Sequence, residues 1–129
     1  MGESETLTIL VVDDDPTGRL LTVELLRKRF PHAVMLEEES AVVALVHVQT
    51  RRLELIVSDN SMMELSGISF IRKIRQIDSR VPIILHTASH ELRQEAMRAG
   101  ATAFVPSNEA HRLAEVAEAI LRTADTPPC

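Results

Sequence analysis

Apolar and polar positions alternate along this chain on two different periods. Short runs rich in valine and isoleucine are typical of strands that are buried on both faces. Such runs occupy residues 7–12, 33–36, 55–58, 81–86 and 103–105. The longer segments between them repeat their apolar residues every three or four positions, as a helix with one buried face does. The pattern therefore predicts five strands that alternate with five helices.

Capping residues mark the ends of several of these helices. Asp15 followed by Pro16 is a favourable start for the first helix, whose apolar positions are Leu20, Val23, Leu26 and Phe30. Ser40 is placed to cap a short second helix that runs to about residue 49. A fourth helix over about 91–99 should end at Gly100, because glycine is the residue most often found just after a helix.

The alternation favours one fold class. Buried strands separated by helices form a parallel sheet covered on both faces, which is a doubly wound α/β three-layer sandwich. We expect right-handed crossovers and the flavodoxin-like strand order 2-1-3-4-5. At 129 residues the chain is long enough for one such domain, which we place at residues 1–125, with 126–129 as a tail or the start of a linker.

Composition and charge narrow the classes of partner. The formal net charge is −5, which argues against direct binding of nucleic acid, because phosphate backbones favour basic surfaces. Cys129 is the single cysteine, so no disulfide can form within the chain. No apolar run is long enough to span a membrane, and the start of the chain is too polar for a signal peptide. We therefore expect a cytoplasmic location and no membrane partner.

Oxygen-bearing side chains follow three of the predicted strands. Asp13 and Asp14 follow the first strand, Asp59 follows the third, and Thr87 follows the fourth. In an open parallel sheet, the carboxyl ends of the strands border one crevice, and strands one and three would be neighbours. Three carboxylates in one crevice repel one another unless a cation joins them, and oxygen ligands favour Mg²⁺ (or Mn²⁺). An aspartate beside such an ion can act as a nucleophile toward phosphorus.

Several motifs in order along the chain carry a family resemblance. They are residues 9–16 (ILVVDDDP), 55–59 (LIVSD) and 83–88 (IILHTA), with Gly67 after the third strand and residues 99–101 (AGA) before the fifth. Together they resemble the receiver (response-regulator) domains of two-component signal transduction systems. The resemblance covers nearly the whole chain. It implies a phosphoprotein that takes part in phosphorelay signalling, and not an enzyme beyond assisting its own phosphorylation and dephosphorylation.

The resemblance assigns a role to each site residue. By it, Asp59 is the phosphoacceptor, and the metal ligands are Asp13, Asp14, Asp59 and the backbone carbonyl of Ser61. Thr87 and Ala88 would contact the phosphoryl group, and Thr87 and Phe104 would form the switch. The donor would be a histidine kinase or a histidine phosphotransfer protein. The output surface, residues 91–121, would bind a downstream protein, a covalently linked output domain or a second copy of the chain.

Two positions depart from the family pattern. The family has a lysine near the end of the fifth strand that contacts the phosphoryl group, whereas this chain has Ser107 there, and no lysine follows Lys73. A serine hydroxyl can donate a hydrogen bond but supplies no charge. Met63 replaces the proline that is usual after the phosphoacceptor. We therefore predict a receiver with an intact acidic pocket and altered switching.

Alternative interpretations remain for the same residues. The spacing of Asp13, Asp15 and Thr17 also matches the first motif of haloacid-dehalogenase-like phosphatases, with Asp13 as nucleophile and Asp15 as acid/base, but this leaves Asp59 without a role. A receiver-like binding module that works without phosphate is a further alternative, which Ser107 favours. His86 alternates away from Thr87 along its strand, so we predict a core histidine with a satisfied hydrogen bond.

Overall fold

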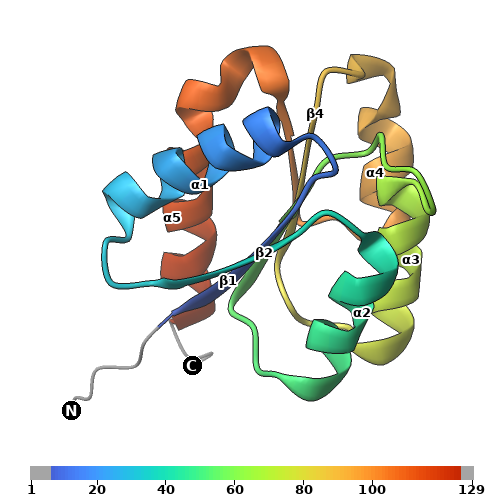
Figure 1. Ribbon diagram of the computed structural model, residues 1–129, viewed down its shortest axis with the longest axis horizontal. Helices are drawn as coiled ribbons and strands as arrows, with labels where there is room; N and C mark the ends of the chain where they lie inside the picture. The colour runs from blue at the N-terminus through green and yellow to red at the C-terminus, as the bar shows by residue number, and fades with distance from the viewer. Residues whose placement is uncertain (1–6, 126–129) are drawn as a thin grey trace.

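Five parallel strands form a single sheet in the order β2-β1-β3-β4-β5. The computed structural model describes residues 7–125. The strands are β1 (Thr8–Val12), β2 (Val34–Glu38), β3 (Leu55–Ser58), β4 (Ile83–Thr87) and β5 (Ala103–Pro106). The predicted strand order and fold class are confirmed (Figure 1).

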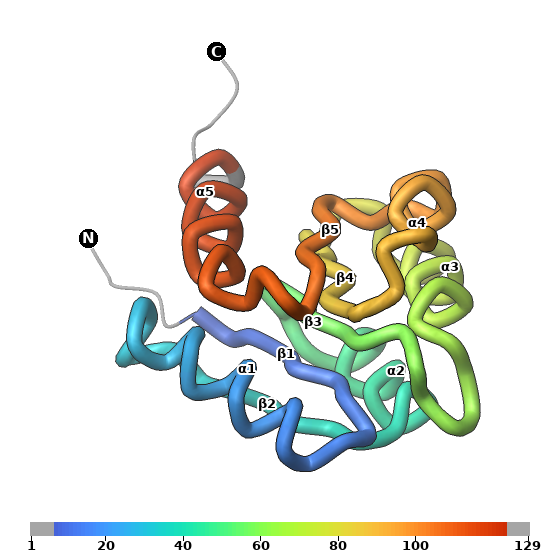
Figure 2. Tube along the Cα trace, turned by 90° about the horizontal axis from the view of Figure 1, so that it is seen from above, coloured from blue at the N-terminus to red at the C-terminus, as the bar shows by residue number. Residues whose placement is uncertain are grey.

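Helices cover both faces of this sheet, as Figure 2 shows from above. The α-helices are α1 (Pro16–Arg29), α2 (Ala41–Thr50), α3 (Gly67–Ile77), α4 (Arg93–Ala99) and α5 (Leu113–Asp125), and the 3₁₀ helices are η1 (His90–Leu92) and η2 (Ser107–Arg112). Helices α1 and α5 pack together on one face, while α2, α3 and α4 pack side by side on the other. None of the helices in the described part of the chain is long and apolar enough to cross a membrane.

Two apolar cores lie on the two faces of the sheet, because successive strand side chains point to opposite sides. On β1, Ile9 and Val11 contribute to the core beneath α1 and α5, and Leu10 and Val12 to the core beneath α2, α3 and α4. Phe70 is completely buried in the second of these cores. The central strands are thus buried on both faces, which is the reason for their unbroken apolar runs.

The register of the strands determines which residues meet at their carboxyl ends. Val12 pairs with Ser58, so the residues that follow them, Asp13 and Asp59, leave the sheet at the same level. The main chain of Asp59 continues this pairing, because its N–H donates to the carbonyl of Val12 at 3.1 Å. The fold therefore places the acidic residues from two distant segments next to each other.

Some predicted boundaries were wrong at the edges of the fold. The second strand was predicted to end at residue 36 but continues to Glu38, since an edge strand tolerates polar residues that conceal it in the sequence. Leu20 was expected on the inner face of α1, yet it is 57% exposed, and the buried side chains of this helix are Thr22, Val23 and Leu26. The predicted tail at 126–129 lies outside the described residues.

Arg75 joins three segments at the edge of the sheet where the strands begin, opposite the edge that carries the acidic residues. Its guanidinium group donates to the carbonyls of Gly100 at 2.9 Å, Asp78 at 3.2 Å and Val81 at 2.7 Å. Gly100 ends α4 with φ of 118°, a conformation that side chains rarely adopt. One side chain therefore satisfies three carbonyl groups that no regular element would pair.

Candidate functional site

Three carboxylates converge at the carboxyl end of the sheet. Asp13, Asp14 and Asp59 each offer a carboxylate oxygen, and these atoms lie within 4.8 Å of one another. All three side chains are partly buried. The sequence-predicted convergence of these residues is therefore present in the structure.

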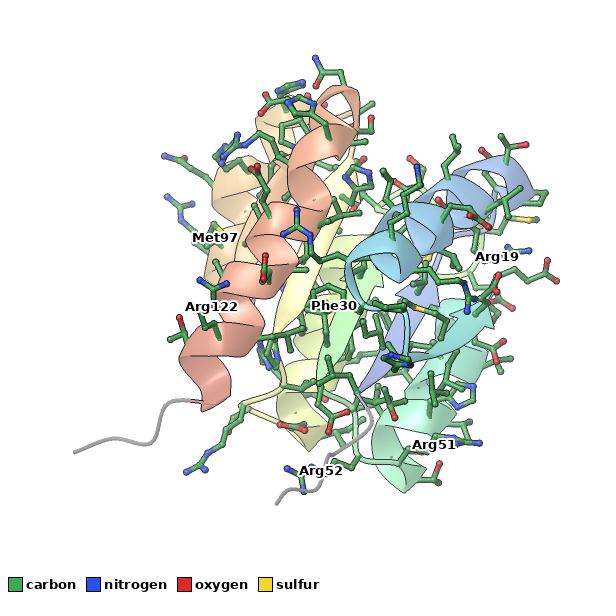
Figure 3. The ribbon with its side chains drawn as sticks, turned by 90° about the vertical axis from the view of Figure 1, so that its left-hand side faces the viewer. Arg19, Phe30, Arg51, Arg52, Met97 and Arg122 are labelled. Atoms are coloured by element: carbon green, nitrogen blue, oxygen red, sulfur yellow. The ribbon has the colours of Figure 1, made fainter. Side chains whose placement is uncertain are left out.

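Main-chain hydrogen bonds position the two residues that follow β1. Oδ1 of Asp13 accepts from the N–H of Asp15 at 2.9 Å, and Nη1 of Arg19 donates to the carbonyl of Asp13 at 2.7 Å. Figure 3 shows Arg19 between α1 and the end of β2, where its Nε is 3.7 Å from a carboxylate oxygen of Glu37. Asp15 caps α1 by accepting from the N–H groups of Thr17 and Gly18. The helix start predicted at Asp15 and Pro16 is therefore confirmed.

A close approach of the main chain positions the third carboxylate. Gly67 begins α3, and its N–H donates to the carbonyl of Asn60 at 2.9 Å. A Cβ atom on Gly67 would lie 2.5 Å from the main-chain oxygen of Asp59 and 2.8 Å from Cα of Asn60, so only glycine fits. The side chain of Asn60 also accepts from the N–H of Ile68 at 3.2 Å. The loop after β3 is therefore held against the start of α3.

Burial makes the charged forms of Asp13 and Asp59 costly. It raises the pKa of Asp13 from 3.8 to about 6, with smaller contributions from the charges of Asp59, Asp15 and Asp14. Burial also raises the pKa of Asp59, while hydrogen bonds from the N–H of Asn60 and from Thr87 act in the opposite direction. Oxygen donors that repel one another in this way fit a hard divalent cation such as Mg²⁺.

An open cleft of about 320 Å³ lies beside the carboxylates. Its walls include most of the residues predicted for the site, namely Asp13, Asp59, Ser61, Thr87, Ala88 and Ser107. Asp14 instead borders a second hollow of about 260 Å³, together with Glu39, Ser40, Met63 and Glu64. The cluster therefore lies between two accessible depressions of the surface, and the larger one has room for a phosphoryl group.

The two residues predicted as a switch lie on neighbouring strands. Thr87 ends β4 with only 3% of its surface exposed, and its Oγ1 accepts from the N–H of Ser89 at 3.4 Å. Phe104 on β5 is 7% exposed and belongs to the core beneath α2, α3 and α4. The guanidinium carbon of Arg93 lies 4.9 Å from the centre of the Phe104 ring. Phe104 is therefore part of that core and not of the lining of the cleft.

His86 was predicted as a core histidine with a satisfied hydrogen bond. The hydrogen bond is present, but the side chain is only partly buried. Its Nδ1 donates to the carbonyl of Val105 at 2.8 Å, because a carbonyl can only accept. However, the ring also lines the cleft with Asp59 and Thr87. Burial lowers the pKa of His86, and the charge of Asp59 acts in the opposite direction. The alternation along β4 correctly predicted that His86 points to the face opposite Thr87. At the carboxyl end of the strand, however, this face borders the cleft.

The sequence matches one family of known proteins. Residues 9–118 match the family model described as the response regulator receiver domain. Chemotaxis protein CheY of Bacillus subtilis is 30% identical over 99 residues, which cover 75% of this chain and 82% of that protein. The chain belongs to the response regulator receiver domain family of two-component systems.

Larger relatives contain this domain as one part. Transcriptional regulatory protein ZraR of Salmonella typhimurium is 33% identical over 124 residues, which cover 93% of this chain but 28% of that protein. Fimbriae Z protein of Escherichia coli is 26% identical over 100 residues, with 76% of this chain and 48% of that protein covered. The chain thus spans less than half the length of these two relatives.

Solved receiver structures share the fold. The receiver domain of NtrX from Brucella abortus superposes with a TM-score of 0.80 at 28% identity, covering 89% of this chain and 98% of that one. A CheY-like receiver domain protein from Methanospirillum hungatei gives a TM-score of 0.82 at 21% identity, covering 92% of this chain and 96% of that one. This family is one of signalling domains and not of conventional enzymes, which favours the receiver interpretation over a phosphatase.

Proposed function

We propose that this receiver domain accepts a phosphoryl group on Asp59 from a histidine kinase or a histidine phosphotransfer protein, in a Mg²⁺-dependent reaction. The observation that carries the proposal is the cluster of Asp13, Asp14 and Asp59, whose oxygens lie within 4.8 Å of one another beside an open cleft. Asp59 lines that cleft and accepts a hydrogen bond from the side chain of Thr87, which lowers the pKa of Asp59.

The transfer requires Asp59 in its charged form. One of its carboxylate oxygens forms a bond to phosphorus while the bond from phosphorus to the donor's histidine nitrogen breaks, and that nitrogen keeps the electron pair. Asp13, Asp14, Asp59 and the main-chain carbonyl of Ser61 would hold Mg²⁺. Bound there, the ion supplies positive charge that offsets the charges of the carboxylates and of the phosphoryl group.

The groups around Asp59 then hold the product. Thr87 and Ala88 line the cleft. The hydroxyl of Thr87 and the N–H of Ala88 would donate hydrogen bonds to phosphoryl oxygens. Movement of Thr87 toward the phosphoryl group would alter the packing at Phe104 on the neighbouring strand. The signal would leave through the surface formed by α4, β5 and α5. Ser107 borders the cleft without a charge, so we expect weaker coupling of phosphate to that surface.

The partners follow from this reaction. The domain, residues 1–125, would act as a cytoplasmic signalling module that assists only its own phosphorylation and dephosphorylation. Its α4-β5-α5 surface would bind a downstream protein, an output domain of the same chain or a second copy of the domain. ZraR, of which the matched part is 28%, illustrates a receiver within a longer regulatory protein.

Intact mass spectrometry tests the proposal. The protein is incubated with Mg²⁺ and acetyl phosphate, and wild type is compared with Asp59→Asn and with Asp78→Asn as a matched control. We expect one added phosphoryl group in wild type and in the control, and none in Asp59→Asn or in excess EDTA. Absence of any addition in wild type, even from a phosphorylated histidine phosphotransfer protein, would contradict the proposal.

Ser107 favours a second candidate, a receiver-like binding module that works without phosphate. Its side chain is exposed at the cleft, where a longer basic side chain would reach the phosphoryl group. Equal binding of a downstream partner by wild type and Asp59→Asn, with and without acetyl phosphate, would support this module. Binding that requires both Asp59 and the phosphodonor would exclude it.

A further inference from the structure

The cleft beside Asp59 contains one side chain that can carry a positive charge. The described residues that line it are otherwise neutral or acidic, with Asp13, Asp15 and Asp59 as the acidic ones. His86 is the exception. A phosphoryl group carries two negative charges near neutral pH, so a cation beside it contributes strongly to binding. Among the described residues that line the cleft, His86 is therefore the one that can supply positive charge to a phosphoryl group.

The ring of His86 has one nitrogen engaged and one available. Nδ1 donates to the carbonyl of Val105, which pairs with His86 across β4 and β5. Among the described residues, no buried side-chain nitrogen or oxygen lacks a hydrogen-bond partner. Nε2 of His86 has no hydrogen-bond partner among the described residues, so it is accessible to solvent, and the residue lines the cleft. The strand thus orients the ring and leaves Nε2 for a ligand.

The position of the ring relative to the phosphoacceptor supports the same role. His86 and Asp59 share two depressions, the cleft and a small cavity of about 10 Å³ that Asp13 also lines. The two groups also interact electrostatically. The charge of Asp59 raises the pKa of His86, and the charge of His86 lowers the pKa of Asp59. A phosphoryl group attached to Asp59 would enter the cleft that the ring also lines.

The other described residues that line the space around the ring are acidic or neutral. Asp59 faces it from the end of β3, and Asp13 from the end of β1. Thr22 lines the same space from α1, and Ser107 from the start of η2. Since burial lowers the pKa of His86, the ring is mainly neutral before phosphorylation. Added negative charge in the cleft favours the imidazolium form, whose Nε2–H can donate.

We propose that the imidazole of His86 binds the phosphoryl group on Asp59 through Nε2 and supplies the positive charge that Ser107 cannot. This proposal rests on the proposed function, because it concerns the product of phosphorylation at Asp59. Thr87 would contact another phosphoryl oxygen, and Mg²⁺ held by Asp13, Asp14 and Asp59 would supply further positive charge. The contact depends on the histidine that directly precedes Thr87 in this chain.

Two substitutions at this position test the proposal. His86→Gln keeps an amide N–H for the carbonyl of Val105 but removes the charge, and His86→Lys restores a charge. His32→Gln is the matched control, because His32 is exposed and distant in the fold from the cleft. Each protein is phosphorylated with acetyl phosphate and Mg²⁺, and the rate and final extent are followed by intact mass at about pH 6 and about pH 8. Thermal unfolding confirms that each variant is folded.

The proposal expects a distinct pattern across these proteins. His86→Gln should lower the rate or extent of phosphorylation about tenfold at about pH 6, and by less at about pH 8, where fewer wild-type rings are charged. His86→Lys should retain phosphorylation with little change between the two pH values, and His32→Gln should match wild type. A merely structural role would not produce the rescue by lysine or the pH dependence.

Other outcomes separate the two proposals. Normal phosphorylation of His86→Gln at both pH values overturns the role of His86 and leaves the function of Asp59 intact. Failure of wild type itself to be phosphorylated overturns the proposed function. If His86→Gln does not fold, the ¹⁵N shifts of the His86 ring in wild type decide: they should move toward those of imidazolium when beryllofluoride and Mg²⁺ are added. Unchanged ring shifts would overturn the proposal.

Discussion

Replacing Asp13 by asparagine should stabilise the metal-free protein at neutral pH. Burial raises the pKa of Asp13 to about 6, so the folded protein favours the uncharged carboxyl group and must bear the cost of ionising it at pH 7. Asparagine is uncharged and keeps the oxygen that accepts from the N–H of Asp15 at 2.9 Å. The substitution therefore removes an unfavourable charge without removing the turn that starts α1.

The expected gain follows from the change in pKa. The difference between the ordinary value of 3.8 and about 6 corresponds to about 3 kcal/mol at most. The side chain is only half-buried, and solvent screening reduces this figure to about 1–2 kcal/mol. Because the folded pKa is raised, the stability linked to Asp13 is fully present below pH 3.8 and is lost as the pH rises through about 6. The advantage of the variant should therefore be near zero at about pH 4 and complete above about pH 7.

Urea denaturation in EDTA at several pH values measures this advantage. Asp78→Asn is the matched control, because the Asp78 carboxylate accepts from the N–H groups of Arg80 at 2.8 Å and Val81 at 3.0 Å, far from the cluster. A variant that is no more stable than wild type above pH 7, or an advantage that does not change with pH, would refute the reasoning. Added Mg²⁺ should stabilise wild type and reduce the difference, since the ion binds only the folded site.

Two further substitutions should lower the free energy of unfolding. Gly67→Ala places a Cβ atom 2.5 Å from the main-chain oxygen of Asp59, and urea denaturation should show a loss of about 1–3 kcal/mol. An unchanged midpoint would mean that the loop after β3 relaxes freely. Arg75→Met removes three hydrogen bonds to carbonyl groups, and we expect a loss of about 2–3 kcal/mol by the same assay. Arg72→Met, on an exposed face of α3, is its control and should change stability by less than about 0.5 kcal/mol.

Much of the fold could be predicted because the central strands are buried on both faces. β1, β3 and β4 therefore appear in the sequence as unbroken apolar runs. β2 lies at an edge, where one side is open to solvent, and its polar Glu37 and Glu38 hid the second half of the strand. Leu20 shows the converse difficulty, since an apolar residue on a helix can also face solvent.

The candidate site could be predicted in part for a topological reason. Parallel strands end at one edge, so Asp13 and Asp59 must meet once β1 and β3 are neighbours. The position of His86 needed the structure, because strand alternation gives a face of the sheet and not whether that face is covered. Arg75 also needed it: its partners at Gly100 and Val81 come together only in the folded chain.

The direction of the strands also governs how this domain tolerates attachment to other molecules. Every strand runs toward the cleft, so β1 begins at the opposite pole, and α5, which returns along the sheet, ends at that pole too (Figure 1). The start of β1 and the end of α5, where a reporter, surface anchor or affinity handle would be attached, therefore lie away from Asp59. Because β1 begins and α5 ends at the same pole, the domain is also a candidate for circular permutation. In such a variant the two ends are linked and a new break is made in a surface loop.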